Sequence, residues 1–164
     1  MEVSAQRHTL VEILFPQGLP RLWCPPLTHF RADGRIDAAR MGRHLEVISP
    51  YARGVLVPGS TGEGWDMTDA EVRELLGVVL GAAQELELRV LIGVLRRNLA
   101  EMLAVIQGTA SWLCDRTGLS SDLAAMCAQG VVGFTVCAPS GAELTEDQIR
   151  EGLAAVLELG HPTA

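Results

Sequence analysis

Apolar residues occur along the chain in two alternating patterns. Short continuous runs are followed by longer stretches in which apolar residues return every three or four positions. The short runs predict buried strands, and the longer stretches predict helices with one buried face. The predicted strands lie at 21–28, 54–58, 89–95 and 132–138. Because a helical stretch follows each strand, the pattern predicts an α/β fold of four βα units with a parallel sheet.

Capping residues mark the expected start of each helix. Four helices are predicted to begin after Asp37, Thr68, Asn98 and Thr145, whose side chains suit the first position of a helix. A Glu or Gln lies three residues after each of the two threonines, which completes a capping box. The last helix is expected to bury Ile149, Leu153, Val156 and Leu157.

The third unit is longer than the others. Extra helical sequence runs over about 108–129, with a break near Gly118 and a new cap at Ser120 or Ser121. This segment is interpreted as an insertion after the third strand, packed on the outside of the fold.

Residues 1–20 are interpreted as a lead-in segment with one short helix before Pro16. Residues 21–164 then form the domain. Two architectures fit four βα units, a small open sheet and half of an eight-fold barrel, which needs about 250 residues to close. The hydrophobic pattern alone leaves both open.

Charge and composition narrow the function classes. The 164 residues carry a net charge of −7, and all 13 basic residues are arginines. Without a basic cluster, nucleic acid is not expected as a partner. No apolar run approaches the roughly 18 residues that cross a membrane. Glu2 and Glu12 lie in the N-terminal region, which therefore does not resemble a signal peptide. A soluble cytoplasmic protein is expected.

Cysteines and histidines do not form a recognisable metal site. No CxxC or HExxH spacing occurs, so neither a metal nor another cofactor is expected. The cysteines are predicted to be buried, reduced thiols. The chain has four cysteines and four histidines, which are Cys24, Cys114, Cys127, Cys137, His8, His29, His44 and His161.

The sequence VLVPGSTGEG places a glycine-rich turn directly after the second strand. Gly59 and Gly64 fit the G-x-x-x-x-G frame of a phosphate-binding loop, but Trp65 and Asp66 stand where Lys and Ser/Thr are required. Glu63 inside the turn would also repel a phosphate. Phosphate binding, and with it a nucleotide-binding protein, is therefore disfavoured.

A carboxylate fits this turn better than a phosphate. The backbone N–H groups and hydroxyls of Ser60 and Thr61 lie at the carboxyl end of a strand and could bind a carboxylate, while a hydroxyl could also transfer a proton. The alternative is a plain turn whose glycines only permit a tight backbone. The residues themselves leave both interpretations open.

Three segments resemble one known family. PGSTGEG resembles the GTTGE motif of the dihydrodipicolinate synthase / N-acetylneuraminate lyase family. PLTHFRADGRID is similar to its TPF-x-x-DG-x-ID segment, and GVVGFTVCAPSG is similar to its fourth strand and the following loop. The resemblance runs from about Leu22 to Gly160, with the motifs in family order.

The resemblance implies a fold, a reaction and site residues. The fold would be a TIM barrel, of which this chain holds the first four βα units. The reaction would be a lyase or aldolase step on pyruvate or a related 2-keto acid through a Schiff base. Gly59, Ser60 and Thr61 would bind the keto-acid carboxylate, and the Ser60 hydroxyl would also relay a proton.

The sequence departs from the family after the fourth strand and in the first loop. The family has tyrosines after the proline that corresponds to Pro139, but Ser140 and Gly141 follow here, and no tyrosine occurs past Tyr51. His29 replaces the usual proline of the first motif. These differences indicate a divergent branch.

The nucleophile of the family is also missing. Its Schiff-base lysine lies on strand six, whereas this chain contains no lysine and ends where strand five should begin. The expectation is therefore a lyase as a full-length protein, with this 164-residue chain inactive alone. The alternative is a free-standing, non-catalytic half-barrel that acts as a binding or oligomerising module.

Half a barrel is expected to associate with itself. Strands one and four would be unpaired edges, and such edges favour association. A homo-oligomer is therefore predicted. The side chains expected to lack partners from the missing half are Val55, Val57, Leu91 and Phe134.

Overall fold

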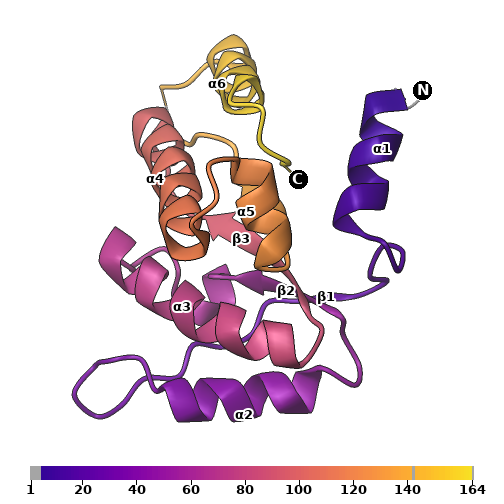
Figure 1. Cartoon of the computed structure of the whole chain (residues 1–164). Helices are drawn as coiled ribbons and strands as arrows, with labels where there is room; N and C mark the ends of the chain where they lie inside the picture. Colours follow the sequence, from indigo (N-terminus) through magenta and orange to yellow (C-terminus); the bar gives the residue numbers. More distant parts are fainter. Residues whose placement is uncertain (1–4, 142, 164) are drawn as a thin grey trace.

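The protein forms one parallel sheet covered by helices (Figure 1). The structure is a computed structural model that describes residues 5–141 and 143–163. The four strands lie in the order β1-β2-β3-β4, and every neighbouring pair is parallel, as predicted. Their bounds are Trp23–Cys24 for β1, Gly54–Val57 for β2, Arg89–Val94 for β3 and Val131–Val136 for β4.

The helices begin at the predicted capping residues. The side chains of Asp37, Thr68, Asn98 and Thr145 each accept a hydrogen bond from a backbone N–H in the first turn, and both capping boxes are formed. The helices are α1 (Ala5–Leu14), α2 (Ala38–Ile48), α3 (Asp69–Glu85), α4 (Leu99–Thr117), α5 (Asp122–Ala128) and α6 (Glu146–Glu158), with the short 3₁₀ helix η1 (Ser60–Gly62) after β2.

All four strands end before their predicted limits, by one residue in β2 and β3 and by more in β1 and β4. β1 contains two residues, because Pro25 and Pro26 follow it and proline has no N–H to donate to a neighbouring strand. β4 begins and ends before the predicted limits. It ends at Val136, which pairs with Val94, the last residue of β3, so no partner strand extends further.

The hydrophobic core lies between the sheet and the helices. Successive strand residues point to opposite faces of a sheet, and Val55, Val57 and Phe134 are buried on the helical side. The prediction that these three side chains lack partners was wrong, because they face the helices rather than the open face. Leu91 and Leu56 are only half-buried.

The segment at 108–129 is helical with the predicted break. Gly118 ends α4 in the left-handed conformation, and the Ser121 side chain caps α5. Ala125 and Met126 are completely buried, and α5 contacts α4 and β4. The segment is therefore part of the helical layer and its core, not an addition to the outer surface. Its status as an insertion relative to the family stays a prediction.

The C-terminal residues pair with the edge of β4. The Phe134 N–H donates to the Pro162 carbonyl oxygen at 2.8 Å, and Thr163 forms a parallel bridge with Phe134. The edge of β4 is therefore partly covered, contrary to the expectation of a fully unpaired strand four. Leu157 in α6 was expected to be buried but is 62% exposed.

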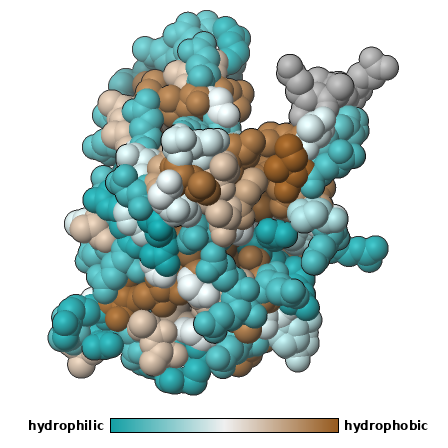
Figure 2. Space-filling view, in the orientation of Figure 1, coloured by the Kyte–Doolittle hydropathy of each residue, from teal (hydrophilic) through white to brown (hydrophobic). Residues whose placement is uncertain are grey.

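Helix α1 confirms the short helix predicted before Pro16. Figure 2 shows hydrophobic surface between this helix and the C-terminal segment, where Leu10, Leu159 and Pro162 are among the residues that line a pocket. No helix in the described ranges is long and apolar enough to cross a membrane.

Candidate functional site

The glycine-rich turn lies at the carboxyl end of β2. A cis peptide bond joins Val57 to Pro58, and the chain then enters η1. The Gly59 carbonyl oxygen accepts hydrogen bonds from the N–H groups of Gly62 at 3.0 Å and Gly64 at 3.1 Å. Glu63 adopts the left-handed conformation with φ of 62° and reverses the chain. The predicted tight turn is therefore present.

Neighbouring loops hold this turn in place. The Thr28 hydroxyl, in the loop after β1, donates to the Gly62 carbonyl oxygen at 2.8 Å. A Cβ atom on Gly62 would lie 2.9 Å from that hydroxyl oxygen, and one on Gly59 would lie 2.9 Å from Pro25 Cβ. Glycine is therefore required where the turn packs against the β1 loop.

The turn exposes the predicted carboxylate-binding groups. Gly59 is buried, whereas Ser60 and Thr61 are exposed. Within the described part of the chain, the hydroxyls and N–H groups of Ser60 and Thr61 form no hydrogen bond. Because the first N–H groups of a helix have no partner inside it, they remain available to an acceptor. The structure thus brings two hydroxyls and two backbone donors together at the carboxyl edge of the sheet.

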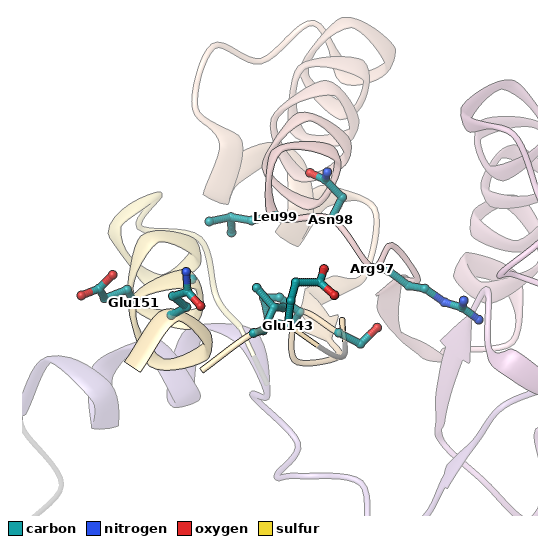
Figure 3. A pocket seen from close by; sticks show the side chains of 10 residues that line it. Arg97, Asn98, Leu99, Glu143 and Glu151 are labelled. Atoms are coloured by element: carbon teal, nitrogen blue, oxygen red, sulfur yellow. The ribbon is translucent and has the colours of Figure 1, made fainter. Parts of the chain in front are cut away.

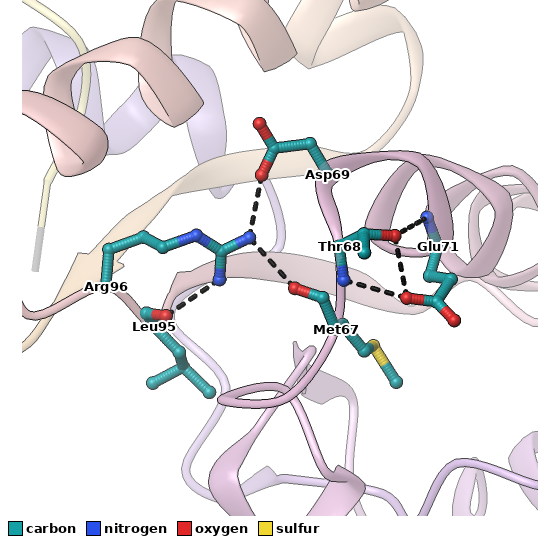
Figure 4. A network of polar contacts seen from close by, with 6 residues as sticks. All are labelled: Met67, Thr68, Asp69, Glu71, Leu95 and Arg96. Carbon is teal, nitrogen blue, oxygen red and sulfur yellow. Dashed lines mark hydrogen bonds and ion pairs between the residues drawn. The ribbon is translucent and has the colours of Figure 1, made fainter.

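Arg96 fixes the adjacent loop after β3 (Figure 4). Its guanidinium donates to the carbonyl oxygens of Leu95 at 2.8 Å and Met67 at 3.0 Å, and to the Asp69 carboxylate at 2.7 Å. The Arg96 side chain is 15% exposed. These contacts tie the end of β3 to the start of α3, so Arg96 has a structural role beside the turn.

A cavity of about 510 Å³ opens between the loops that follow β3 and β4 (Figure 3). The Ser140 N–H donates to the Arg97 carbonyl oxygen at 3.3 Å and joins these two loops. Its lining includes Arg97, Asn98, Pro139, Ser140, Glu143 and Glu151. The sequence motifs did not predict this cavity. A usable signal was that polar residues follow two adjacent parallel strands at the same edge.

Two histidines contact each other beside the β1 loop. His29 Nε2 and His44 Nδ1 are 2.9 Å apart. Loss of hydration and the nearby His44 lower the pKa of His29 below its usual value. No cluster of three metal-ligating side chains occurs among the described residues.

The cysteines are unpaired thiols. Cys24, Cys114 and Cys127 are partly buried, but Cys137 is exposed, so the expectation of burial was wrong for that residue. Burial raises the pKa of Cys114 and of Cys127, which keeps both thiols protonated near neutral pH.

No family model matches the chain. The chain is similar to a curated relative, the 4-hydroxy-tetrahydrodipicolinate synthase of Mycolicibacterium paratuberculosis. The two sequences are 43% identical over 70 residues. The resemblance to the dihydrodipicolinate synthase family is confirmed. The matched segment covers 41% of this chain and 23% of that synthase.

Solved structures of the dihydrodipicolinate synthase family and of a related aldolase share the fold. The 2-keto-3-deoxygluconate aldolase of Sulfolobus matches with a TM-score of 0.66 and 20% identity, over 87% of this chain and 42% of the aldolase. An E. coli prophage protein of the family, solved with pyruvate, matches with a TM-score of 0.61 and 20% identity. The match covers 83% of this chain and 40% of that protein. The chain therefore spans about 40% of these relatives and has the α/β architecture of part of their TIM barrel.

Proposed function

We propose that this chain carries the carboxylate-binding part of a lyase or synthase that acts on pyruvate or a related 2-keto acid through a Schiff base. The observation that carries this proposal is the η1 turn, whose free donors at Ser60 and Thr61 lie at the carboxyl end of β2. Catalytic groups of TIM barrels lie at this end of the strands. The pyruvate complex of the related E. coli protein supports this substrate class.

In this proposal each residue of the turn has a distinct role. The buried Gly59 lets the backbone approach the ligand, and the Ser60 and Thr61 N–H groups and hydroxyls bind its carboxylate. The Ser60 hydroxyl relays a proton to or from the reacting centre. The nucleophilic amine is absent, because the chain has no lysine. This chain alone is therefore proposed to bind the keto acid without turning it over.

An alternative function is a non-catalytic half-barrel that binds or oligomerises. The observation that favours it is the complete burial of Val55, Ile92 and Phe134 within this chain, which gives the fragment its own core. In both cases a homo-oligomer is the proposed assembly.

Titration of the ¹⁵N-labelled chain with pyruvate tests the proposed site. The amide signals of Ser60 and Thr61 should shift and saturate, and Ser60→Ala should weaken binding about tenfold, as for the loss of one hydrogen bond to a charged group. Ser121→Ala is the control, because this serine caps α5 away from the turn. Unchanged Ser60 and Thr61 signals at saturating pyruvate would contradict the carboxylate site and favour the non-catalytic module.

A further inference from the structure

Three arginines lie together at the amino ends of the first three strands. Arg53 directly precedes β2 and Arg89 begins β3, and the Arg89 N–H donates to the Arg53 carbonyl oxygen at 2.8 Å. Arg21 lies two residues before β1, which pairs with the start of β2. Because parallel strands all begin at the same edge of a sheet, the three residues share the edge opposite the glycine-rich turn.

The three arginines line one pocket of about 310 Å³. Its walls are the segment that leads into β1, the turn before β2 and the loop between α3 and β3. Glu87 is the one acidic residue in this lining, and the remaining lining residues are uncharged. The pocket therefore has an excess of positive charge, although the whole chain has a net charge of −7.

The guanidinium groups in this pocket have few partners of their own. Arg53 Nη1 donates to the Leu86 carbonyl oxygen at 3.1 Å, which orients the side chain and leaves its other N–H groups available. The side chains of Arg21 and Arg89 form no hydrogen bond or ion pair within the described part of the chain, and Glu87 pairs with none of the three. Arg89 is also half-buried. A partly buried cation without a counter-charge is costly, so an anion bound here would compensate it.

The rim of the pocket is apolar. Leu19 is 61% exposed, Leu22 is 56% exposed and Tyr51 is 82% exposed, and all three line the pocket with the arginines. Small-molecule sites combine apolar and aromatic surface with a few polar groups that fix the orientation of the ligand. The ligand that fits this lining has an anionic group for the arginines and an organic part for the rim.

We infer that the pocket formed by Arg21, Arg53 and Arg89 binds a small organic phosphate ester. Guanidinium groups bind phosphate oxygens through paired, charge-assisted hydrogen bonds, and a phosphate offers more oxygens and more charge than a single carboxylate. The pocket lies at the opposite edge of the sheet from the Gly59–Thr61 turn, so this inference goes beyond the proposed function and does not depend on it.

A small ligand suits this pocket better than a nucleic acid does. The arginines are confined to one pocket, and the chain as a whole is negatively charged. The phosphates of a nucleic acid would extend beyond the pocket, where the net negative charge repels them.

Three ligands test the inference by NMR titration of the ¹⁵N-labelled chain at constant ionic strength. Phenyl phosphate carries both the phosphate and an organic group, benzoate replaces the phosphate with a carboxylate, and inorganic phosphate lacks the ring. The Nε–H signals of Arg21, Arg53 and Arg89 should shift and saturate with phenyl phosphate, whereas the Ser60 and Thr61 amides should not shift. Benzoate should bind about tenfold more weakly, as for the loss of one hydrogen-bonded charge contact. Inorganic phosphate should also bind more weakly, because it makes no contact with the apolar rim.

The variants separate local contacts from a change in net charge. Arg21→Gln and Arg89→Gln should each weaken the binding of phenyl phosphate about tenfold. Arg21 is exposed, so its replacement leaves the core intact even if the change at the half-buried Arg89 disturbs the fold. Arg150→Gln is the matched control, because Arg150 is 76% exposed on α6 and pairs with Asp147. This variant should keep the affinity of the unmodified chain.

Four results would overturn the inference. Phenyl phosphate that fails to saturate the three arginine signals would show that the pocket binds no such ligand. Benzoate that binds as tightly as phenyl phosphate would show that phosphate is not recognised. Equal weakening in Arg21→Gln and Arg150→Gln would assign the effect to net charge. A single-stranded oligonucleotide that binds more tightly than phenyl phosphate through the same arginines would identify a nucleic-acid site instead.

Discussion

His29 occupies a position where the resembled family has proline, and it replaces a rigid residue with a titratable one. Its ring contacts His44 on α2, and the preceding residue, Thr28, holds the glycine-rich turn through Gly62. The loop after β1 supports the proposed carboxylate site, and the contact between the two histidines attaches this loop to α2. Their contact requires one neutral ring nitrogen as acceptor, so it is weakened when both rings are protonated.

This contact predicts lower stability in mild acid. The pKa of His29 is lowered by loss of hydration and by the charges of His44, Arg40 and Arg43. The charge of Asp37 acts in the opposite direction but does not cancel this effect. The folded state then binds fewer protons than the unfolded state. The contribution of His29 to stability is complete above its unfolded pKa of about 6.5 and is lost as pH falls from there toward the lower folded value. Urea unfolding should show a lower free energy of unfolding at pH 5.5 than at pH 7.5.

Variants identify the group responsible for this pH dependence. His29→Gln should reduce the loss of unfolding free energy between the two pH values, whereas His8→Gln on the exposed side of α1 should leave it unchanged. If His29→Gln and the unmodified chain lose the same free energy, the pair does not control acid stability.

At the level of single residues, the sequence predicted the turn but not the cavity beside it. The turn is recognisable because its glycines, Ser60 and Thr61 are consecutive in the chain. Arg97 and Ser140 are distant in sequence and meet only because β3 and β4 are neighbours. The contact between Arg97 and Trp65 also joins residues that are distant in sequence, so the sequence did not predict it.

At the level of elements, the close approach of β2 and β3 depends on Gly93. A Cβ atom there would collide with the Pro58 carbonyl oxygen, immediately before the glycine-rich turn. Gly93→Ala should therefore lower the free energy of unfolding by about 1–3 kcal/mol, as for overpacking in a core.

A second glycine variant provides the control. Gly77 lies within α3 with open space around its Cα, so Gly77→Ala should raise stability by about 0.5–1 kcal/mol through the better helix propensity of alanine. Chemical denaturation of both variants measures the difference. If Gly93→Ala and the unmodified chain have the same free energy of unfolding, β2 and β3 can move apart to accept a Cβ atom without loss of stability, which would contradict the prediction.

Helix starts were predictable because capping is a local interaction. Thr68 and Thr145 form their capping boxes with residues three positions away. The limits of β1 and β4 and the exposure of Leu157 were not predictable in the same way. A strand ends where its partner ends, and a helix face is buried only where another element covers it.

At the level of the whole molecule, the sheet has one covered and one open face. Helices bury Val55 and Val57, whereas Leu56 and Leu91 on the opposite face are half-buried. The edge of β1 also lacks a partner strand in the described sheet. Apolar surface next to an open edge favours association.

Sedimentation velocity should therefore show a mass that increases with protein concentration. Leu91→Gln should reduce this association, because it places a polar group on the open face. Leu157→Gln on the exposed part of α6 is the control and should associate like the unmodified chain. A concentration-independent monomer would contradict the proposed self-association.

Reductive trapping tests the central claim, that this chain binds the keto-acid carboxylate but lacks the nucleophile. The chain is incubated with pyruvate at a concentration that saturates the Ser60 and Thr61 amide shifts, and is then treated with borohydride and analysed by intact mass and peptide mapping. The account predicts no adduct in the site, because an imine requires an amine and the chain has no lysine. A pyruvate adduct mapped to the Gly59–Thr61 turn or the adjoining cavity, accompanied by turnover, would contradict it.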